Sequence, residues 1–350
     1  MRDFPQLRIL VLGAGYGLLF AVRAALGGHH ITIVCRPGEA EVLNAEGPVI
    51  DLPARKTGIR MQISRQNASL DIVAVSPNSV DPGAYDLVVL AMQETHFRDP
   101  EISNLSLKIA GNEQPVVSIM NMALPPFLKR LPGVWHDDLS EFYHAPDLWA
   151  EFSPSAFTHS SPDPQAIRPD PSRKNYVKVT LDSNFKIAPF AQPKHSKMLR
   201  SLCRSANLAA SLHNSLSRPR VQLLPVRSEF TPLAKWPMLM TGNYRCITDG
   251  TPMSIAETIA DDSITSRRLY ECTRHLCTVL GADVDALVTY EAYVKAASQL
   301  SSPSSVALAL EHGRTRIERM DKVIQFLHLA SGLPNPDLDR IVVTIDNRLV

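Results

Sequence analysis

The segment that most constrains the fold is the N-terminal run, where an apolar stretch meets a glycine turn and then a helix-forming stretch. The apolar stretch is 7–12 (LRILVL), and helix-forming residues follow from Tyr16 to Leu26. Glycines in such a turn let the backbone approach a pyrophosphate, and the following helix N-terminus offers it N–H groups and a partial positive charge. The pattern predicts a dinucleotide site at Gly13, Ala14, Gly15, Tyr16 and Gly17.

The glycine spacing departs from the usual GxGxxG fingerprint. The third glycine would fall at Leu18, whereas Gly17 lies one place early. A one-residue deletion in the turn would explain the shift. The alternative interpretation is a plain glycine turn that binds no ligand.

Further strands are predicted at 31–34, 85–92 and 115–120, separated by helical or loop segments. Such alternation indicates a parallel sheet with crossover connections, which is a doubly wound α/β domain of Rossmann type. The segment 153–193 holds seven prolines around one strand pattern at 176–181. We interpret it as an antiparallel extension of the same sheet with a long surface loop.

The C-terminal part shows helical patterns at 266–280, 283–297 and 305–330. A glycine and a proline follow the last pattern and are expected to end its helix. An all-helical domain is therefore expected after the α/β domain. The predicted organisation is a Rossmann-like NADP-binding domain with the sheet extension at 1–195, a connecting helix and linker at 196–226, and a helical domain for substrate binding and dimerisation at 227–350.

The end of the second strand discriminates between coenzymes. A site for NAD usually places Asp or Glu there to accept a hydrogen bond from the ribose 2′-hydroxyl. The sequence at this point is Val34-Cys35-Arg36-Pro37, with no acid. The planar guanidinium of Arg36 suits a 2′-phosphate, which a carboxylate would repel. NADPH (and NADP) is therefore expected over NADH, the alternative being that Arg36 is a solvated loop charge.

Composition narrows the function classes. The formal net charge of +1 gives no reason to expect nucleic acid or a membrane as partner. The five cysteines form no CxxC pair and the eleven histidines no HExxH motif, which argues against a disulfide framework and a metal site. No apolar run reaches the ~20 residues of a membrane span, and the N-terminus does not fit a signal peptide. We expect a cytoplasmic protein with a small-molecule substrate.

The first half of the chain resembles the ketopantoate reductase (2-dehydropantoate 2-reductase) family. The resemblance lies in RILVLGAGYGLLFAVRAALGGHHITIVCR, which includes Arg36 at the position of the family's 2′-phosphate arginine, in the strand YDLVVLAMQ, and in VSIMN ending at Asn121. It implies an NADPH-dependent reductase with a Rossmann half and a helical half. Two positions depart from the family pattern, because Gln93 replaces a lysine near substrate and cofactor and Met122 replaces a glycine.

The second half carries the resemblance to the catalytic residues. Lys235, followed eight residues later by Asn243, is similar to the family's W-x-K-L-x(6)-N stretch and implies that Lys235 is the general acid. The first of the two family asparagines is Leu239 here. The segments around Ser305 and from Gly313 to Glu318 are similar to the family's SSMLQD and RTEID motifs, and the family glutamate falls on Arg316, with Glu318 as the alternative.

The chemistry of these residues supports such roles. Hydride transfer to a 2-oxo acid leaves negative charge on the carbonyl oxygen, so a positioned proton donor is required. Lys235 lies in an apolar stretch, so its ammonium is expected to be partly desolvated; the alternative is a lysine that only extends to water. Asn121, Asn243, Ser305 and Arg316 are candidate substrate contacts, and Asn121 is also a candidate contact of the nicotinamide ribose of the cofactor. The arginine at position 316 predicts a more acidic substrate than ketopantoate. The alternatives are caps for the asparagines and a solvated charge for Arg316.

Three functions are compatible with these observations. The first is an NADPH-dependent reductase of a 2-oxo acid or related carbonyl. The second is an imine reductase resembling opine dehydrogenases, and the third is a non-catalytic NADP(H)-binding sensor. Because long C-terminal helices often pair between protomers, a homodimer is the expected assembly.

Overall fold

The computed structural model describes residues 4–53, 60–133, 139–213 and 221–349. The chain divides into two compact units. Unit 1 consists of Met1–Met120 with Asp147–Arg227, and unit 2 of Asn121–Pro146 with Ser228–Val350. This division differs from the domain boundaries expected above, since 121–146 groups with the helical unit. The expected connecting helix is part of unit 1, and 214–220 of the expected linker lie outside the described residues.

The main sheet of unit 1 confirms the doubly wound α/β prediction. Among the described residues it has eight strands in the order β12-β11-β8-β7-β6-β1-β2-β5. The strands from β5 to β8 in this order pair in parallel, and crossover connections join strands that follow one another in the chain. β11 pairs antiparallel with β8, so the expected antiparallel extension is present. The bounds are β1 Arg8–Leu12, β2 His30–Val34, β5 Ile72–Val75, β6 Leu87–Leu90, β7 Val116–Ile119, β8 Phe157–Ser161, β11 Phe185–Ile187 and β12 Leu223–Pro225.

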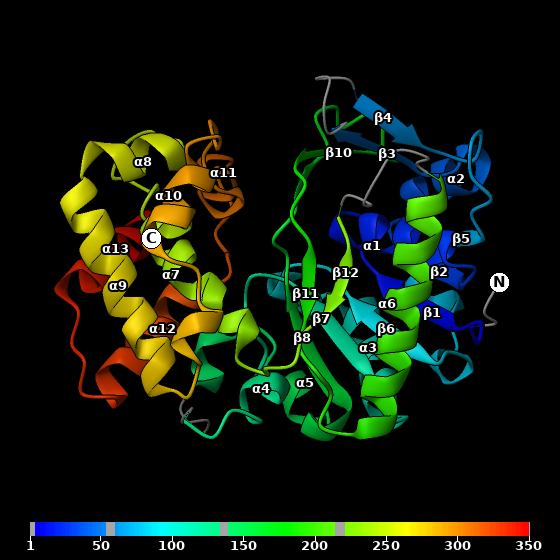
Figure 1. Cartoon of the computed structure of the whole chain (residues 1–350), viewed down its shortest axis with the longest axis horizontal. Coiled ribbons are helices and arrows are strands. Elements are labelled where there is room, and N and C mark those ends of the chain that lie inside the picture. Colours follow the sequence, from blue (N-terminus) through cyan, green and yellow to red (C-terminus); the bar gives the residue numbers. More distant parts are fainter. Residues whose placement is uncertain (1–3, 54–59, 134–138, 214–220, 350) are drawn as a thin grey trace. The chain divides into compact units, whose positions relative to one another are not determined.

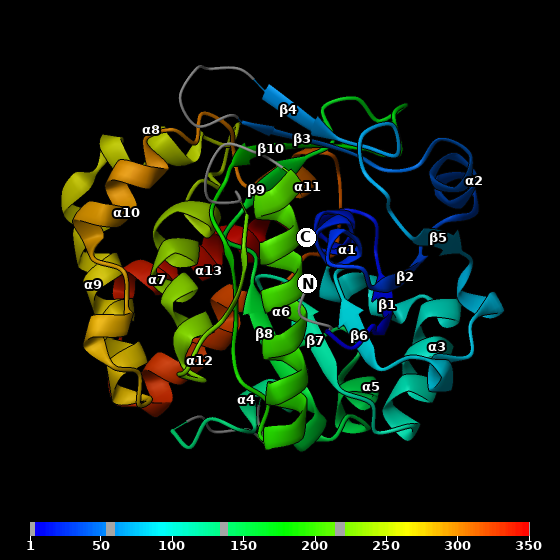
Figure 2. The same ribbon diagram turned by 45° about the vertical axis from the view of Figure 1, so that its right-hand side comes forward.

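The predicted strand at 176–181 exists, but its placement in the main sheet was wrong. It is β10 (Tyr176–Leu181), which belongs to a second, four-stranded sheet of the described residues with β3 (Val49–Pro53), β4 (Arg60–Ile63) and β9 (Gln165–Ile167). Figure 2 shows these strands together above α1. The Tyr176 hydroxyl donates to Asp51 Oδ2 at 2.6 Å, a long-range contact that local sequence does not reveal.

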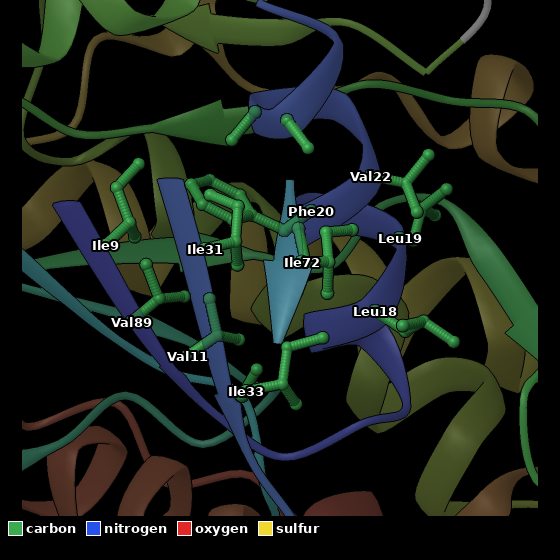
Figure 3. Packing of buried hydrophobic residues seen from close by; sticks show 14 of the residues in the cluster. Ile9, Val11, Leu18, Leu19, Phe20, Val22, Ile31, Ile33, Ile72 and Val89 are labelled. Atoms are coloured by element: carbon green, nitrogen blue, oxygen red, sulfur yellow. The ribbon is translucent and has the colours of Figure 1, made fainter. Parts of the chain in front are cut away.

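Helix α1 (Tyr16–Leu26) lies in the middle of the unit 1 core and has the bounds predicted from the sequence. Its side chains from Leu18 to Ala25 are buried. Figure 3 shows the packing of Leu18, Leu19, Phe20 and Val22 with residues of the strands, among them Ile9, Val11 and Val89. Burial on all sides of α1 arises because α6 (Pro193–His213) packs against it (Figure 1). The other α-helices in this part of the chain are α2 Pro37–Glu46, α3 Pro100–Gly111 and α5 Pro146–Ala150.

Unit 2 is helical, as predicted, although its helix boundaries differ. The pattern at 266–280 is α9, whereas the pattern at 305–330 is two helices with a break at 312–319, where Gly313 has φ +72°. A last helix, which the sequence analysis did not predict, begins beyond Pro334. The α-helices are α4 Pro125–Leu128, α7 Trp236–Met238, α8 Ile255–Asp261, α9 Ser263–Val279, α10 Tyr290–Ala297, α11 Ser305–Glu311, α12 Met320–Ala330 and α13 Pro336–Arg348. Within the described ranges, no helix has the length and apolar character to cross a membrane.

Candidate functional site

The turn between β1 and α1 is built around a glycine that no other residue replaces without strain. Gly13 has φ +105°, and a Cβ there would lie 2.5 Å from Met92 Cγ and 2.6 Å from the Ala91 carbonyl oxygen. Its N–H donates to Val34 O at 2.9 Å, which ties the turn to the end of β2. The turn is therefore held at the carboxyl ends of β1, β2 and β6, the edge at which parallel α/β sheets bind ligands.

The other two glycines of the turn have separate roles. Gly15 is the N-cap residue of α1, and a Cβ there would meet no atom within 4 Å, so the surface above it is open. A Cβ on Gly17 would lie 2.8 Å from Val11 Cγ1 and 3.1 Å from Ala91 Cβ. Gly17 thus lets α1 approach the sheet closely, which is the role of the third fingerprint glycine. The early position of Gly17 preserves the packing function, and Leu18 belongs to the core.

The turn fits the pyrophosphate of a dinucleotide. The first N–H groups of a helix lack partners within the helix, and they carry a partial positive charge. The first turn of α1 contains no acidic residue that would repel an anion, and Gly15 leaves the backbone accessible. Ala14 is buried and Tyr16 half-buried, and burial raises the pKa of the Tyr16 phenol to about 12, so this hydroxyl stays neutral.

Three charged side chains lie at the end of β2. Arg36 is exposed and makes no ion pair within the described ranges. Glu39, in the first turn of α2, accepts from the Arg36 backbone N–H at 3.3 Å. Arg168 forms an ion pair with Glu39 and donates through Nη2 to the Ala14 carbonyl oxygen at 2.8 Å.

The sequence analysis missed Glu39 and Arg168. It found no acid at the strand end, but the Glu39 carboxylate folds back to that position from three residues further on. The sequence did contain a signal for Glu39, namely an acidic residue in the first turn of the helix that follows the second strand. Arg168 comes from the connection between β9 and β10, 154 residues after Ala14, and nothing local in the sequence points to it.

Gln93 follows β6 at the same sheet edge as the glycine turn. It is exposed and caps the short 3-10 helix η3 (Glu94–Arg98). The neighbouring Glu94 is fully buried and accepts from Trp149 Nε1 at 3.0 Å, which anchors this loop. The anchored loop leaves the Gln93 amide at the surface, at the edge where a dinucleotide would lie.

Lys235 lies in unit 2, where three short helical segments follow one another. It ends the 3-10 helix η6 (Thr231–Lys235), α7 follows, and then the π-helix η7 (Leu239–Tyr244). Lys235 is half-buried between buried neighbours. π-Helical turns are rare and occur often at functional sites. This one depends on Gly242, because a Cβ there would clash with the Tyr293 hydroxyl, which donates to Met238 O at 3.2 Å.

Asn243 is held in place through its backbone. Its carbonyl oxygen accepts from Ser304 Oγ at 2.5 Å and from Cys246 Sγ at 3.2 Å. Its side chain is half-buried. Ser304 is the buried N-cap of α11, whereas Ser305 is exposed as the first residue of that helix. The structure therefore links Ser304, rather than the predicted Ser305, to the Asn243 segment.

Arg316 and Glu318 both lie in the break between α11 and α12. Arg316 is exposed, whereas Glu318 is only 4% exposed. The Tyr244 hydroxyl donates to the Glu318 carbonyl oxygen at 2.6 Å, so Glu318 lies next to the Asn243 segment. Asn121, the remaining predicted contact, is half-buried and is the first residue of unit 2.

Histidine, cysteine and carboxylate side chains of the described ranges form no cluster of three or more that could hold a metal ion. The buried cysteine thiols are also not activated as nucleophiles. Burial raises the pKa of Cys35 to about 12 and raises the pKa values of Cys203 and Cys277 still further above their ordinary value. These cysteines therefore stay protonated at neutral pH.

No family model matches the sequence, and no curated protein matches it. Solved structures do match. A provisionally assigned ketopantoate reductase from Ralstonia solanacearum has a TM-score of 0.68 at 17% identity, with 98% of each chain covered. A D-mandelate dehydrogenase solved with NADH and anilino(oxo)acetate has a TM-score of 0.63 at 14% identity, again with 98% of each chain covered. A dimeric ketopantoate reductase from Staphylococcus aureus has a TM-score of 0.59 at 11% identity and the same coverage.

The chain has the fold of the ketopantoate reductases. The resemblance stated from the sequence is confirmed at the level of the fold, and identities of 17% or less extend it no further. D-Mandelate dehydrogenase shares the fold, so the fold alone does not select a substrate.

Proposed function

We propose that this protein is an NADPH-dependent reductase of a 2-oxo acid or a related carbonyl compound. The observation that carries the proposal is the glycine turn, where Gly13, Gly15 and Gly17 each have the geometry that a dinucleotide site requires. The likeness over 98% of the chain to a dehydrogenase solved with NADH and an oxoacetate supports the reaction class.

The preference for NADPH rests on Arg36. Its exposed guanidinium stands at the end of β2, where the adenine ribose lies in Rossmann domains, and it has no competing ion pair within the described residues. Charge-assisted, bidentate pairing with phosphate is the strongest recognition an arginine provides. Ala14, Tyr16 and Gln93 complete the proposed coenzyme contacts.

In the proposed mechanism Lys235 is the proton donor. When bound, the reduced nicotinamide supplies the hydride for the carbonyl carbon. Lys235 holds a proton at Nζ and delivers it to the carbonyl oxygen as negative charge develops there. Asn121, Asn243 and Ser305 orient the substrate, and Arg316 pairs with its carboxylate. The burial of Glu318 makes it a candidate for positioning Asn243 rather than for binding substrate.

The test is a substrate panel followed by the absorbance of the reduced nicotinamide. We expect NADPH oxidation with at least one 2-oxo acid and none with lactones. Turnover that requires both a 2-oxo acid and an amine would instead establish an imine reductase. Coenzyme binding without turnover on any panel member would establish the non-catalytic sensor and contradict the proposal.

We also propose that the protein is a homodimer, as one ketopantoate reductase of this fold is described to be. Light scattering should give about twice the chain mass of 38.6 kDa. A mass near that of one chain over the micromolar range would contradict this assembly.

A further inference from the structure

A single arginine connects the glycine turn to the end of β2. Arg168 donates to the Ala14 carbonyl oxygen at 2.8 Å and pairs with Glu39, whose other oxygen accepts from the Arg36 N–H at 3.3 Å. The Glu39 carboxylate and the Arg168 guanidinium therefore lie between the glycine turn and the end of β2. These are the two parts of unit 1 that would contact the adenosine half of a dinucleotide.

The position of Glu39 conflicts with a preference for NADPH. A carboxylate at the end of the second strand accepts from the 2′-hydroxyl of NAD and repels the 2′-phosphate of NADP. Glu39 reaches this position even though it lies within α2. Arg36 alone would therefore face the 2′-phosphate with an opposing charge close by.

Arg168 resolves this conflict. Its side chain is 25% exposed and that of Glu39 is 14% exposed, so the pair is shielded enough for solvent not to screen its charges fully. Neutralising Glu39 leaves the charge of Arg36 uncompensated at the strand end. The hydrogen bond to Ala14 fixes the guanidinium, so that Glu39 is held rather than free to turn toward a ribose.

We propose that Arg168 determines coenzyme choice by neutralising and holding Glu39, which converts an NAD-type acid into a site that admits a 2′-phosphate. This inference rests on the proposed function, because it requires a nicotinamide dinucleotide at the glycine turn. Arg168 is a positioning residue in this scheme, and Arg36 makes the phosphate contact.

The test is calorimetric titration of four proteins with NADPH and with NADH. Arg168→Gln should weaken NADPH binding by about tenfold, because it leaves Glu39 opposed to the phosphate. NADH, which lacks the 2′-phosphate, should change by less than about threefold. Glu39→Gln alone should bind NADPH at least as tightly as the wild type, and the double variant Arg168→Gln/Glu39→Gln should recover most of the lost NADPH affinity.

The matched control is Arg60→Gln. Arg60 also pairs with a buried carboxylate, Asp51, and also donates to a backbone carbonyl, that of Val179, but it contacts neither the glycine turn nor α2. The Arg60→Gln substitution should change the stability of the protein without changing the ratio of its affinities for NADPH and NADH. If Arg168→Gln folds poorly, Arg168→Lys retains the charge and should keep the preference for NADPH.

Equal weakening of both coenzymes in Arg168→Gln, or a double variant that recovers no NADPH affinity, would overturn the inference and leave Arg168 as a support of the turn. Failure of the wild type to bind either coenzyme would overturn the proposed function instead. The two failures are thus distinguishable in one set of titrations.

Discussion

Lys235→Ala is expected to lower kcat for the accepted carbonyl substrate by about 10²–10⁴-fold, the usual contribution of a general acid. The reason is that negative charge developing on the carbonyl oxygen would then have to be met by water. NADPH affinity should stay unchanged, because the coenzyme contacts proposed for unit 1 do not include this side chain. Steady-state kinetics for kcat and calorimetry for the coenzyme Kd measure the two quantities separately.

The control for this experiment is Lys295→Ala, which removes an exposed lysine from α10 of the same unit. It should leave both kcat and the melting temperature unchanged. Undiminished turnover in Lys235→Ala would show that the proton comes from elsewhere. A Lys235→Ala protein that melts much earlier than the wild type would point to a structural lysine, so the melting temperature is measured for each variant.

Arg36→Gln is expected to weaken NADPH binding by about 10–100-fold, since hydrogen bonds to charged groups contribute about 1.5–3 kcal/mol. NADH binding should change little, because the 2′-hydroxyl carries no charge for Arg36 to meet. The loss should shrink as salt is added, as expected for an interaction near the protein surface. Titration with both coenzymes at two ionic strengths checks all three statements.

Arg200→Gln is the matched control, because it removes an exposed arginine of α6 from the same unit. Its two coenzyme affinities should equal those of the wild type. An Arg36→Gln protein that still prefers NADPH as strongly as the wild type would contradict the assignment of Arg36 to the 2′-phosphate.

Local patterns predicted the core of unit 1 well. The apolar run at 7–12, the glycines and the helical spacing gave the helix from Tyr16 to Leu26 with its observed bounds. They succeeded because a buried parallel strand and its following helix are specified by adjacent residues. The role of Gly17 was underestimated, because its contact with Val11 and Ala91 depends on how closely α1 approaches the sheet.

What the sequence did not predict depends on contacts between distant residues. β10 joins β3 through pairing across more than a hundred residues, so its sheet was misassigned. Arg168 meets Glu39 and Ala14 for the same reason, and a carboxylate was therefore overlooked at the strand end. The break at 312–319 was missed although its sequence, HGRTRIER, contains a single apolar residue and Gly313, which turns the backbone.

The wild-type titration with NADPH tests the central claim most directly. A dinucleotide seated on Gly15 should give one binding site per chain, tighter for NADPH than for NADH. At a hundredfold excess over Kd it should stabilise the fold by about 2.7 kcal/mol, seen as a higher melting temperature. No heat of binding and an unmoved melting temperature with both coenzymes would contradict the claim.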